Sequence, residues 1–127
     1  MARPRAKELT ERELEIMHIF WDRGESTVNE IRDAIATTGR DLAYTTVATL
    51  VRILTEKNFL QQTNAERPFR FVPLRSFDEV SGSLLGDLMQ KVFGGSREEL
   101  LVKLLDQKKL TAKERAILTD ILGEKRP

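Results

Sequence analysis

The chain has 127 residues, of which 40% are hydrophobic and 32% charged, the composition of an ordinary globular protein of one domain with at most a small appendage. It holds no run of about 18 apolar residues, no signal-peptide pattern and no cysteine, so we expect a cytoplasmic protein with no membrane insertion, disulfide, thiolate metal site or cysteine nucleophile. The net charge of +1 is unevenly distributed, because residues 1–7 carry three bases and no acid, residues 8–33 eight acids and three bases, and residues 40–75 six bases and three acids.

Signals for helix starts recur along the chain. Five Ser or Thr residues are each followed three positions later by Glu, namely Thr10/Glu13, Thr27/Glu30, Ser76/Glu79, Ser96/Glu99 and Thr111/Glu114. This is the capping-box pattern, in which both side chains satisfy backbone N–H groups that the first helical turn leaves without partners. Each pair precedes a stretch with helical apolar spacing, so the sequence predicts a mainly α-helical chain.

The first predicted helix covers residues 10–23 and ends at Gly24. Its apolar residues spread over more than one face, so we expect it to be largely buried. His18 lies on this apolar surface, and we interpret it as a packed core residue rather than a ligand or a catalyst. A second helix is predicted from about residue 27 to Gly39. Its inward residues are expected to be Val28, Ile31, Ala34 and Ile35.

A third helix is predicted over residues 44–58. Its apolar stripe repeats at helical spacing and consists of Val47, Leu50, Val51 and Leu54. The opposite face displays Thr45, Thr49, Arg52 and Glu56, flanked by Thr46 and Ala48. This helix lacks the acidic capping box of the others. Open N–H groups and the positive end of the helix dipole attract a phosphate, although many helices lack the box without any functional reason.

After the third helix the pattern changes to the two-residue period of a strand. Residues 59–63 and 69–73 are predicted to form a small β-hairpin around a turn that contains Asn64 and Pro68. Three helices followed by a hairpin with arginine at its tip is the order of elements in a winged helix-turn-helix. In that fold the third helix enters the major groove and the hairpin lies on the sugar-phosphate backbone. We therefore expect the threonines and Arg52 to face bases, and Arg67 and Arg70 to contact phosphates.

Three further helices are predicted in residues 76–127, at 76–93, 96–107 and 111–122. Their apolar residues cover more surface than a helix on the outside of a domain needs, and a segment this small rarely supports its own core. We therefore expect a winged-helix domain in residues 1–75 and a helical dimerisation domain after it. The candidate dimer contacts are Leu84, Leu88, Val92, Leu101, Leu104, Leu105, Ile117 and Ile121. The alternative is a monomer in which these helices pack on the N-terminal domain.

Several stretches together carry a family resemblance. They are residues 9–17 (LTERELEIM), Trp21, Gly24, residues 27–31 (TVNEI), residues 43–50 (AYTTVATL), residues 67–73 (RPFRFVP) and residues 93–96 (FGGS). They resemble the BlaI/MecI/CopY family of bacterial repressors over nearly the whole chain. The resemblance implies a homodimer that represses genes by binding double-stranded operator DNA at inverted repeats of the TACA/TGTA type. The DNA contacts that it implies fall here on Tyr44, Thr45, Thr46, Thr49 and Arg52 of the third helix and on Arg67 and Arg70 of the wing.

Two departures from the family pattern concern regulation. The copper-sensing branch carries a C-terminal cysteine cluster, and the absence of cysteine excludes copper sensing by thiolates here. In the penicillinase branch a membrane receptor metalloprotease signals by cleaving the repressor at an Asn-Phe bond in its C-terminal helices. The matching bond in this chain is Lys103–Leu104, so proteolytic release remains a hypothesis without its usual recognition residues.

The sequence thus predicts a dimeric transcriptional repressor with no cofactor, metal site or catalytic residue. One alternative is a winged-helix module that binds another protein and no DNA, because a fold does not fix a function. An enzyme is disfavoured, since the chain has one histidine, no cysteine, no Gly-rich phosphate loop and no cluster of carboxylates on one helix face.

Overall fold

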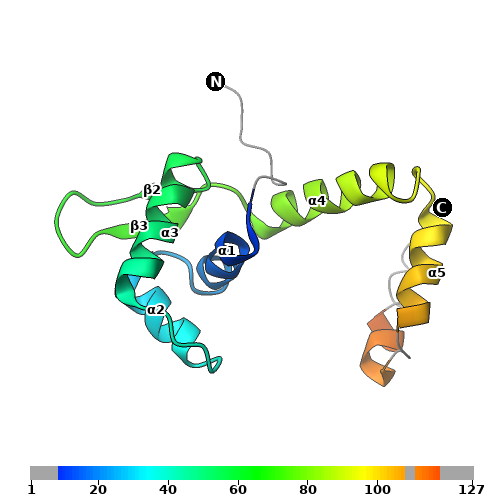
Figure 1. The fold of residues 1–127 in the computed structure, drawn as a ribbon, viewed down its shortest axis with the longest axis horizontal. Coiled ribbons are helices and arrows are strands. Elements are labelled where there is room, and N and C mark those ends of the chain that lie inside the picture. The colour runs from blue at the N-terminus through cyan, green and yellow to red at the C-terminus, as the bar shows by residue number, and fades with distance from the viewer. Residues whose placement is uncertain (1–8, 108–110, 118–127) are drawn as a thin grey trace. The chain divides into compact units, whose positions relative to one another are not determined.

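The structure, a computed structural model, describes residues 9–107 and 111–117. In chain order its elements are α1 (Glu11–Arg23), β1 (Ser26–Thr27), α2 (Val28–Ala36), α3 (Tyr44–Glu56), β2 (Leu60–Gln62), β3 (Arg70–Pro73), α4 (Phe77–Lys91) and α5 (Arg97–Gln107) (Figure 1). Residues 112–117 are also helical. The mainly helical fold with a small hairpin is confirmed. The basic residues 1–7, the end of the last predicted helix and Ile121 lie outside the described residues.

The predicted capping pairs explain where the helices begin. At Thr10 and Thr27 the box is complete, because each hydroxyl accepts from the backbone N–H of the Glu three positions on and that carboxylate accepts from the threonine N–H. The same reciprocal bonds join Thr111 and Glu114, at 2.9 and 3.0 Å. The hydroxyls of Ser76 and Ser96 accept from the N–H groups that open α4 and α5.

The sheet has three antiparallel strands in the order β1-β3-β2, with the hairpin register Leu60↔Pro73, Gln61↔Val72 and Gln62↔Phe71. Strand β1 was not predicted. Thr27 caps α2 as the sequence predicts, and the backbones of Ser26 and Thr27 also pair with Phe71 and Arg70, respectively. A two-residue strand shows no alternation, so only the fold reveals it.

One apolar core joins α1, α2, α3 and the sheet. Its fully buried members include Ile16, Met17, Phe20, Ile31, Ile35, Val47, Val51, Leu54, Phe59 and Leu60. The prediction that His18 is a core residue is wrong, because the buried face of α1 is centred on Ile16, Met17 and Phe20 and leaves His18 exposed. His18 instead lies edge-on to Trp21, with 5.4 Å between the ring centroids.

The first half of α4 belongs to the same compact unit, which extends to Leu85. The indole N–H of Trp21 donates to the carbonyl of Arg75 at 2.9 Å, and its ring packs edge-on against Phe77. Val80 is buried in the core and Leu84 packs against it. These contacts attach the first half of α4 to the winged-helix elements, so the first compact unit ends at Leu85, ten residues beyond the boundary of 75 that the sequence suggests.

The second compact unit begins at Gly86. Gly94 and Gly95 both have positive φ, and the N–H of Gly95 donates to the carbonyl of Met89, which ends α4 as the sequence predicts. From Leu85, the last residue of the first unit, to Ile117, large apolar side chains are between 42 and 66% exposed, namely Leu85, Leu88, Val92, Leu101, Val102, Leu104, Leu105 and Ile117. Across the described ranges, no helix is long and apolar enough to cross a membrane.

Candidate nucleic-acid interface

One face of α3 is open to solvent while the other is in the core. Val47, Val51 and Leu54 are buried, as the apolar stripe predicts. Thr45, Thr49 and Arg52 on the opposite face are exposed, together with Thr46 and with Tyr44, which is 45% exposed. The exposed set carries hydroxyls, methyl groups and a guanidinium, which are the groups that read base edges in a major groove.

The start of α3 differs from the other helix starts. Its N-cap is Ala43, and within residues 9–107 no side chain caps this helix or places a carboxylate in its first turn. The free N–H groups of the first turn therefore stay available, and with the helix dipole they form a local positive end. An anionic group such as a phosphate can bind there without displacing a capping residue.

Arg52 is held by its neighbour on the same helix. Its Nη1 lies 2.9 Å from Oε2 of Glu56, one turn further on, and both side chains are about 60% exposed. Such an exposed pair contributes little stability, about 0.3–0.5 kcal/mol. Its effect is to restrict the rotamers of Arg52, so that the guanidinium lies along the exposed face of α3.

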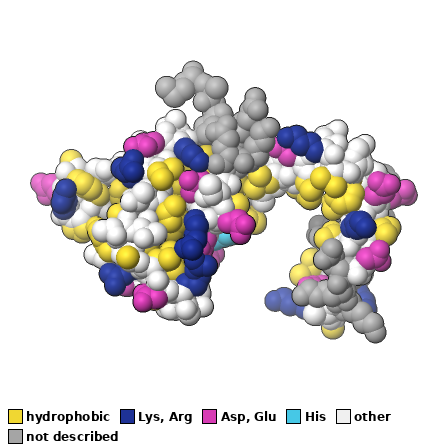
Figure 2. All heavy atoms as spheres, viewed as in Figure 1, with side chains coloured by type: hydrophobic (Ala, Val, Ile, Leu, Met, Phe, Trp, Pro, Cys, Tyr) yellow, Lys and Arg dark blue, Asp and Glu magenta, His cyan; other side chains and the backbone are white. Residues whose placement is uncertain are grey.

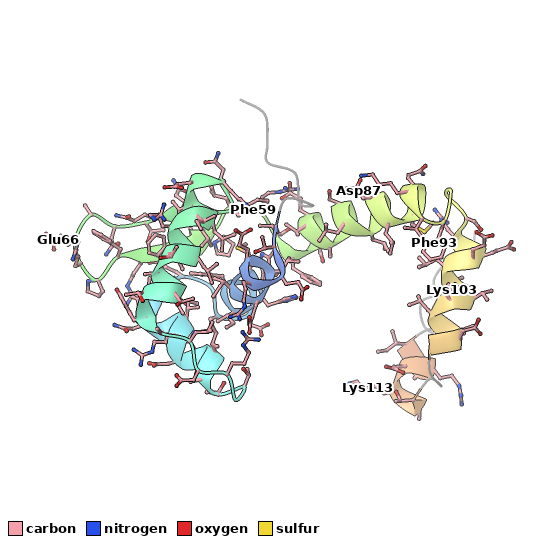
Figure 3. All side chains as sticks on the ribbon, viewed as in Figure 1. Phe59, Glu66, Asp87, Phe93, Lys103 and Lys113 are labelled. Atoms are coloured by element: carbon pink, nitrogen blue, oxygen red, sulfur yellow. The ribbon has the colours of Figure 1, made fainter. Side chains whose placement is uncertain are left out.

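The hairpin between β2 and β3, the wing, is organised by Asn64. Its Nδ2 donates to the carbonyls of Glu66 at 2.8 Å and Pro68 at 3.1 Å, and its Oδ1 accepts from the backbone N–H of Arg70 at 2.7 Å. One side chain thus closes the loop whose tip carries Glu66 (Figure 3). The sequence indicates only that Asn64 favours a turn, and the three hydrogen bonds across the loop appear in the fold alone.

The two wing arginines have different surroundings. The guanidinium of Arg67 lies 5.4 Å from the centroid of the Phe69 ring, on an exposed part of the loop. Arg70 lies on β3 with Nη1 3.8 Å from a carboxylate oxygen of Glu30. Arg67 is therefore the more accessible cation, whereas Arg70 already faces an acid of α2.

Glu30 is itself part of a helix cap. The backbone N–H of Thr27 donates to its carboxylate at 2.9 Å and lowers the pKa of Glu30 below its ordinary value of 4.5. The charges of Arg70 and Arg23 lower the pKa further, against the opposing effect of desolvation. The acid at the start of α2 thus links the capping box of α2 to the strand that supports the wing.

A second acid, Glu13, is buried in the first compact unit, which we call the head. It is 4% exposed, accepts from the N–H of Thr10, and its Oε1 lies 2.9 Å from Nζ of Lys57, just after α3. The pair joins α1 to the end of α3 across 44 residues of sequence. The ion pair of Glu13 and Lys57 therefore helps to hold α3 in its orientation. No pattern in the sequence indicates this pair.

A groove of about 780 Å³ lies between the start of α2, α3 and the wing. Three of the predicted DNA contacts, Tyr44, Arg52 and Arg67, line it together. Figure 2 shows hydrophobic side chains in this part of the molecule, with both basic and acidic side chains around them. The structure thus brings helix and wing residues to one surface, as a winged helix requires. Thr45, Thr46, Thr49 and Arg70 are not among the lining residues.

In the second unit, most of the predicted dimer residues are exposed. Leu88, Val92, Leu101, Leu104, Leu105 and Ile117 are at least 42% exposed, whereas Leu84 packs on the core of the first unit. The candidate cleavage bond, Lys103–Leu104, lies within α5 (Figure 3). In the described ranges no group of His, Cys, Asp or Glu side chains is placed to hold a metal ion.

Comparison with known proteins identifies a family and a similar fold. The sequence profile of the penicillinase repressor family matches residues 9–124. The transcriptional regulator BlaI of Mycobacterium tuberculosis is 36% identical over 94 residues, which cover 72% of this chain and 67% of BlaI. The methicillin resistance regulatory protein MecI of Staphylococcus aureus is 24% identical over 118 residues, covering 93% and 95% of the two chains. Among solved structures, the complex structure of hsRosR-SG has a similar fold, with a TM-score of 0.57 at 15% identity over 94% of each chain.

Proposed function

The chain belongs to the penicillinase repressor family, whose members are transcriptional repressors rather than enzymes, and from this premise we propose that it represses transcription as a dimer bound to a palindromic operator. The observation that carries the proposal is the common surface of α3 and the wing. Tyr44, Arg52 and Arg67 line one groove, and the threonines of α3 are exposed beside it. In a winged helix this surface is the one that meets the duplex.

In the proposed complex the exposed face of α3 lies in the major groove. The methyl groups of Thr45 and Thr49 contact thymine methyls, and Arg52 donates to guanine or to a phosphate. The uncapped first turn of α3, with Tyr44 and Thr46, binds a backbone phosphate. Arg67 and Arg70 of the wing contact the sugar-phosphate backbone and position the head without reading the sequence.

The decisive experiment measures binding by fluorescence anisotropy to a duplex with a TACA/TGTA inverted repeat and to a scrambled duplex, over a series of salt concentrations. We expect preference for the repeat and a steep loss of affinity with salt, because each neutralised phosphate adds about 0.9 to the slope of log K against log salt. The same titrations compare Arg52→Ala, which removes a proposed DNA contact, with the control Arg97→Ala, which removes the same charge from the start of α5. Absence of binding, or binding that ignores both sequence and salt, contradicts the proposal.

The exposed apolar side chains of the second unit support the dimer. Leu88 lies on α4, Val92 directly follows α4, and Leu101 and Leu105 lie on α5. A second copy is the partner that also supplies the second head for an inverted repeat. Leu101→Glu should convert the dimer to a monomer in sedimentation experiments and weaken operator binding by about 10²-fold, since the avidity of two heads is lost. The control is Leu74→Glu, at a similarly exposed leucine of the first unit.

Release by proteolysis is the proposed mode of induction. The bond between Lys103 and Leu104 lies in a helix whose apolar residues are candidates for the dimer contact, so cleavage there would remove Leu104 and Leu105 from the dimer. In cells that contain a receptor metalloprotease of the family's penicillinase branch, mass spectrometry after induction should find a C-terminal fragment that begins at Leu104. An intact chain in induced cells would refute this mode of release.

A further inference from the structure

The groove between α3 and the wing has an apolar interior that DNA binding does not explain. Its walls include Val28 of α2, Ala48 and Val51 of α3, and Phe69 and Phe71 of the wing. Val51 and Phe71 are buried, while the other three are half-buried and form the accessible walls. A sugar-phosphate backbone is anionic and strongly hydrated, and such walls offer it no hydrogen-bond donors. The donors lie at its exposed rim, which includes Asn29, Tyr44, Arg52, Gln62 and Arg67.

The dimensions and the lining are those of a small-molecule site. Ligand pockets typically have volumes of about 300–1,000 Å³, with mostly apolar walls and a few polar groups that orient the ligand. The groove has about 780 Å³. The aromatic rings of Phe69 and Phe71 favour a flat apolar body, because offset stacking adds to the burial of apolar area.

The charged side chains at the rim determine which ligand charge is favoured. Arg52 is paired with Glu56 at 2.9 Å, so these two largely cancel. Arg67 is exposed, lies over the Phe69 ring and forms no ion pair with the residues that the structure describes. The rim therefore carries about one uncompensated positive charge above an aromatic wall, a match for a planar apolar molecule with one anionic group.

We propose that the groove binds a small planar amphipathic anion, and that this ligand and DNA exclude each other. The proposal rests on the proposed function, because exclusion follows from shared residues: Tyr44, Arg52 and Arg67 line the groove and are also the proposed operator contacts. A ligand in the groove binds only the repressor that is free of DNA. It therefore shifts the population away from the DNA complex and lowers the apparent affinity for the operator, more so at higher ligand occupancy.

Binding is tested on the full chain, labelled with ¹⁵N, by two-dimensional NMR titration with 1-naphthoate and with 1-naphthylmethylammonium. These probes share the ring system and differ in charge. Naphthoate should shift the amides of Val28, Ala48 and Phe71 with a saturable dependence, and the cation should bind at least tenfold more weakly. Saturable shifts confined to the leucines of α4 and α5, or equal binding of both probes, would overturn the site.

Two variants separate the apolar walls from the rim. Ala48→Phe fills the groove and should abolish saturable naphthoate shifts while the spectrum stays dispersed, which shows that the chain remains folded. Arg67→Gln should bring the affinities for the anion and the cation within about threefold of each other, whereas Arg97→Gln on α5 should leave the preference intact. Unchanged naphthoate binding in Ala48→Phe would contradict the location.

Mutual exclusion is tested by repeating the operator titration in the presence of naphthoate. At ten times the naphthoate dissociation constant the apparent dissociation constant for the operator should rise about elevenfold for each head that must be free, hence about 120-fold for a dimer that binds through both heads. If naphthoate saturates the groove and operator affinity does not change, exclusion is refuted. A chain that binds no DNA in the absence of naphthoate refutes the proposed function instead, and the NMR titration still decides whether the groove is a ligand site.

Discussion

Replacement of Asn64 tests whether the wing acts as a fixed support for Arg67. The side chain makes three hydrogen bonds to the loop backbone, to the carbonyls of Glu66 and Pro68 and from the N–H of Arg70. A net contribution of about 0.5–1.5 kcal/mol for each bond, reduced because the loop is open to water, gives about 1–2 kcal/mol for holding the loop closed. Asn64→Ala removes that free energy and should leave Arg67 on a mobile loop.

The expected effect on DNA binding follows from the role of a phosphate contact. Asn64→Ala should weaken binding to the operator and to a scrambled duplex by the same factor, since phosphate contacts carry no sequence information. The slope of log K against log salt should fall by about 0.9 for each wing that loses its contact, hence by about 1.8 for a dimer. Anisotropy titrations at four or more salt concentrations measure both quantities.

Asn64→Asp is the informative partner variant, and Gln61→Ala on the neighbouring strand is the control. Aspartate still accepts from the N–H of Arg70 but places an oxygen against the carbonyls of Glu66 and Pro68. Amide hydrogen exchange should therefore show protection of Arg70 retained in Asn64→Asp and lost in Asn64→Ala, while both variants reduce the salt slope. A wild-type slope in both Asn64 variants would refute a positioning role for the loop.

Four further expectations concern the head. Arg52→Ala should reduce discrimination between operator and scrambled DNA, whereas Arg67→Ala should weaken both complexes about equally, as paired titrations will show. Lys57→Met should lower the free energy of unfolding by about 3 kcal/mol, because it leaves a buried carboxylate without its cation. Glu13→Gln should lower the free energy of unfolding by less than Lys57→Met does. The double variant should be more stable than the sum of the two single effects predicts, as urea unfolding will measure, and additive effects would contradict the pairing. Because the pKa of Glu30 is lowered on folding, its contribution is present above the ordinary pKa of 4.5 and is lost as the pH falls through the lower folded value. Stability curves between pH 6 and pH 3 should therefore fall less steeply in Glu30→Gln than in wild type, and parallel curves would contradict this.

Local signals in the sequence predicted the elements of the head. The capping pairs located the starts of α1 and α2, and the stripe of Val47, Val51 and Leu54 gave both the extent of α3 and its buried side. Such features depend on residues within one or two turns, so they can be recognised without the fold. The exposed face of α3 followed from the same periodicity.

Features that depend on distant residues were missed or wrong. Strand β1 exists because Ser26 and Thr27 find a partner in β3, more than 40 residues away. The exposure of His18 depends on which side of an apolar helix meets the core, and α1 has apolar residues on several sides. The buried pair of Glu13 and Lys57 and the ligand groove both arise from the packing of separate elements, for which no local pattern exists.

The charge of this chain illustrates the same difference between local and spatial information. Residues 8–33 have five more acids than bases, which by itself would repel DNA. Several of these acids are engaged within the head, in the pairs Glu13–Lys57, Glu15–Arg40 and Glu30–Arg70. Since salt screens exposed charges beyond about 8–10 Å, attraction to a phosphate depends on the groups close to it rather than on a segment total. At the start of α3 those groups are free N–H donors, and at the wing tip Arg67 lies on an uncharged ring, so a nearly neutral chain can present a locally positive surface to DNA.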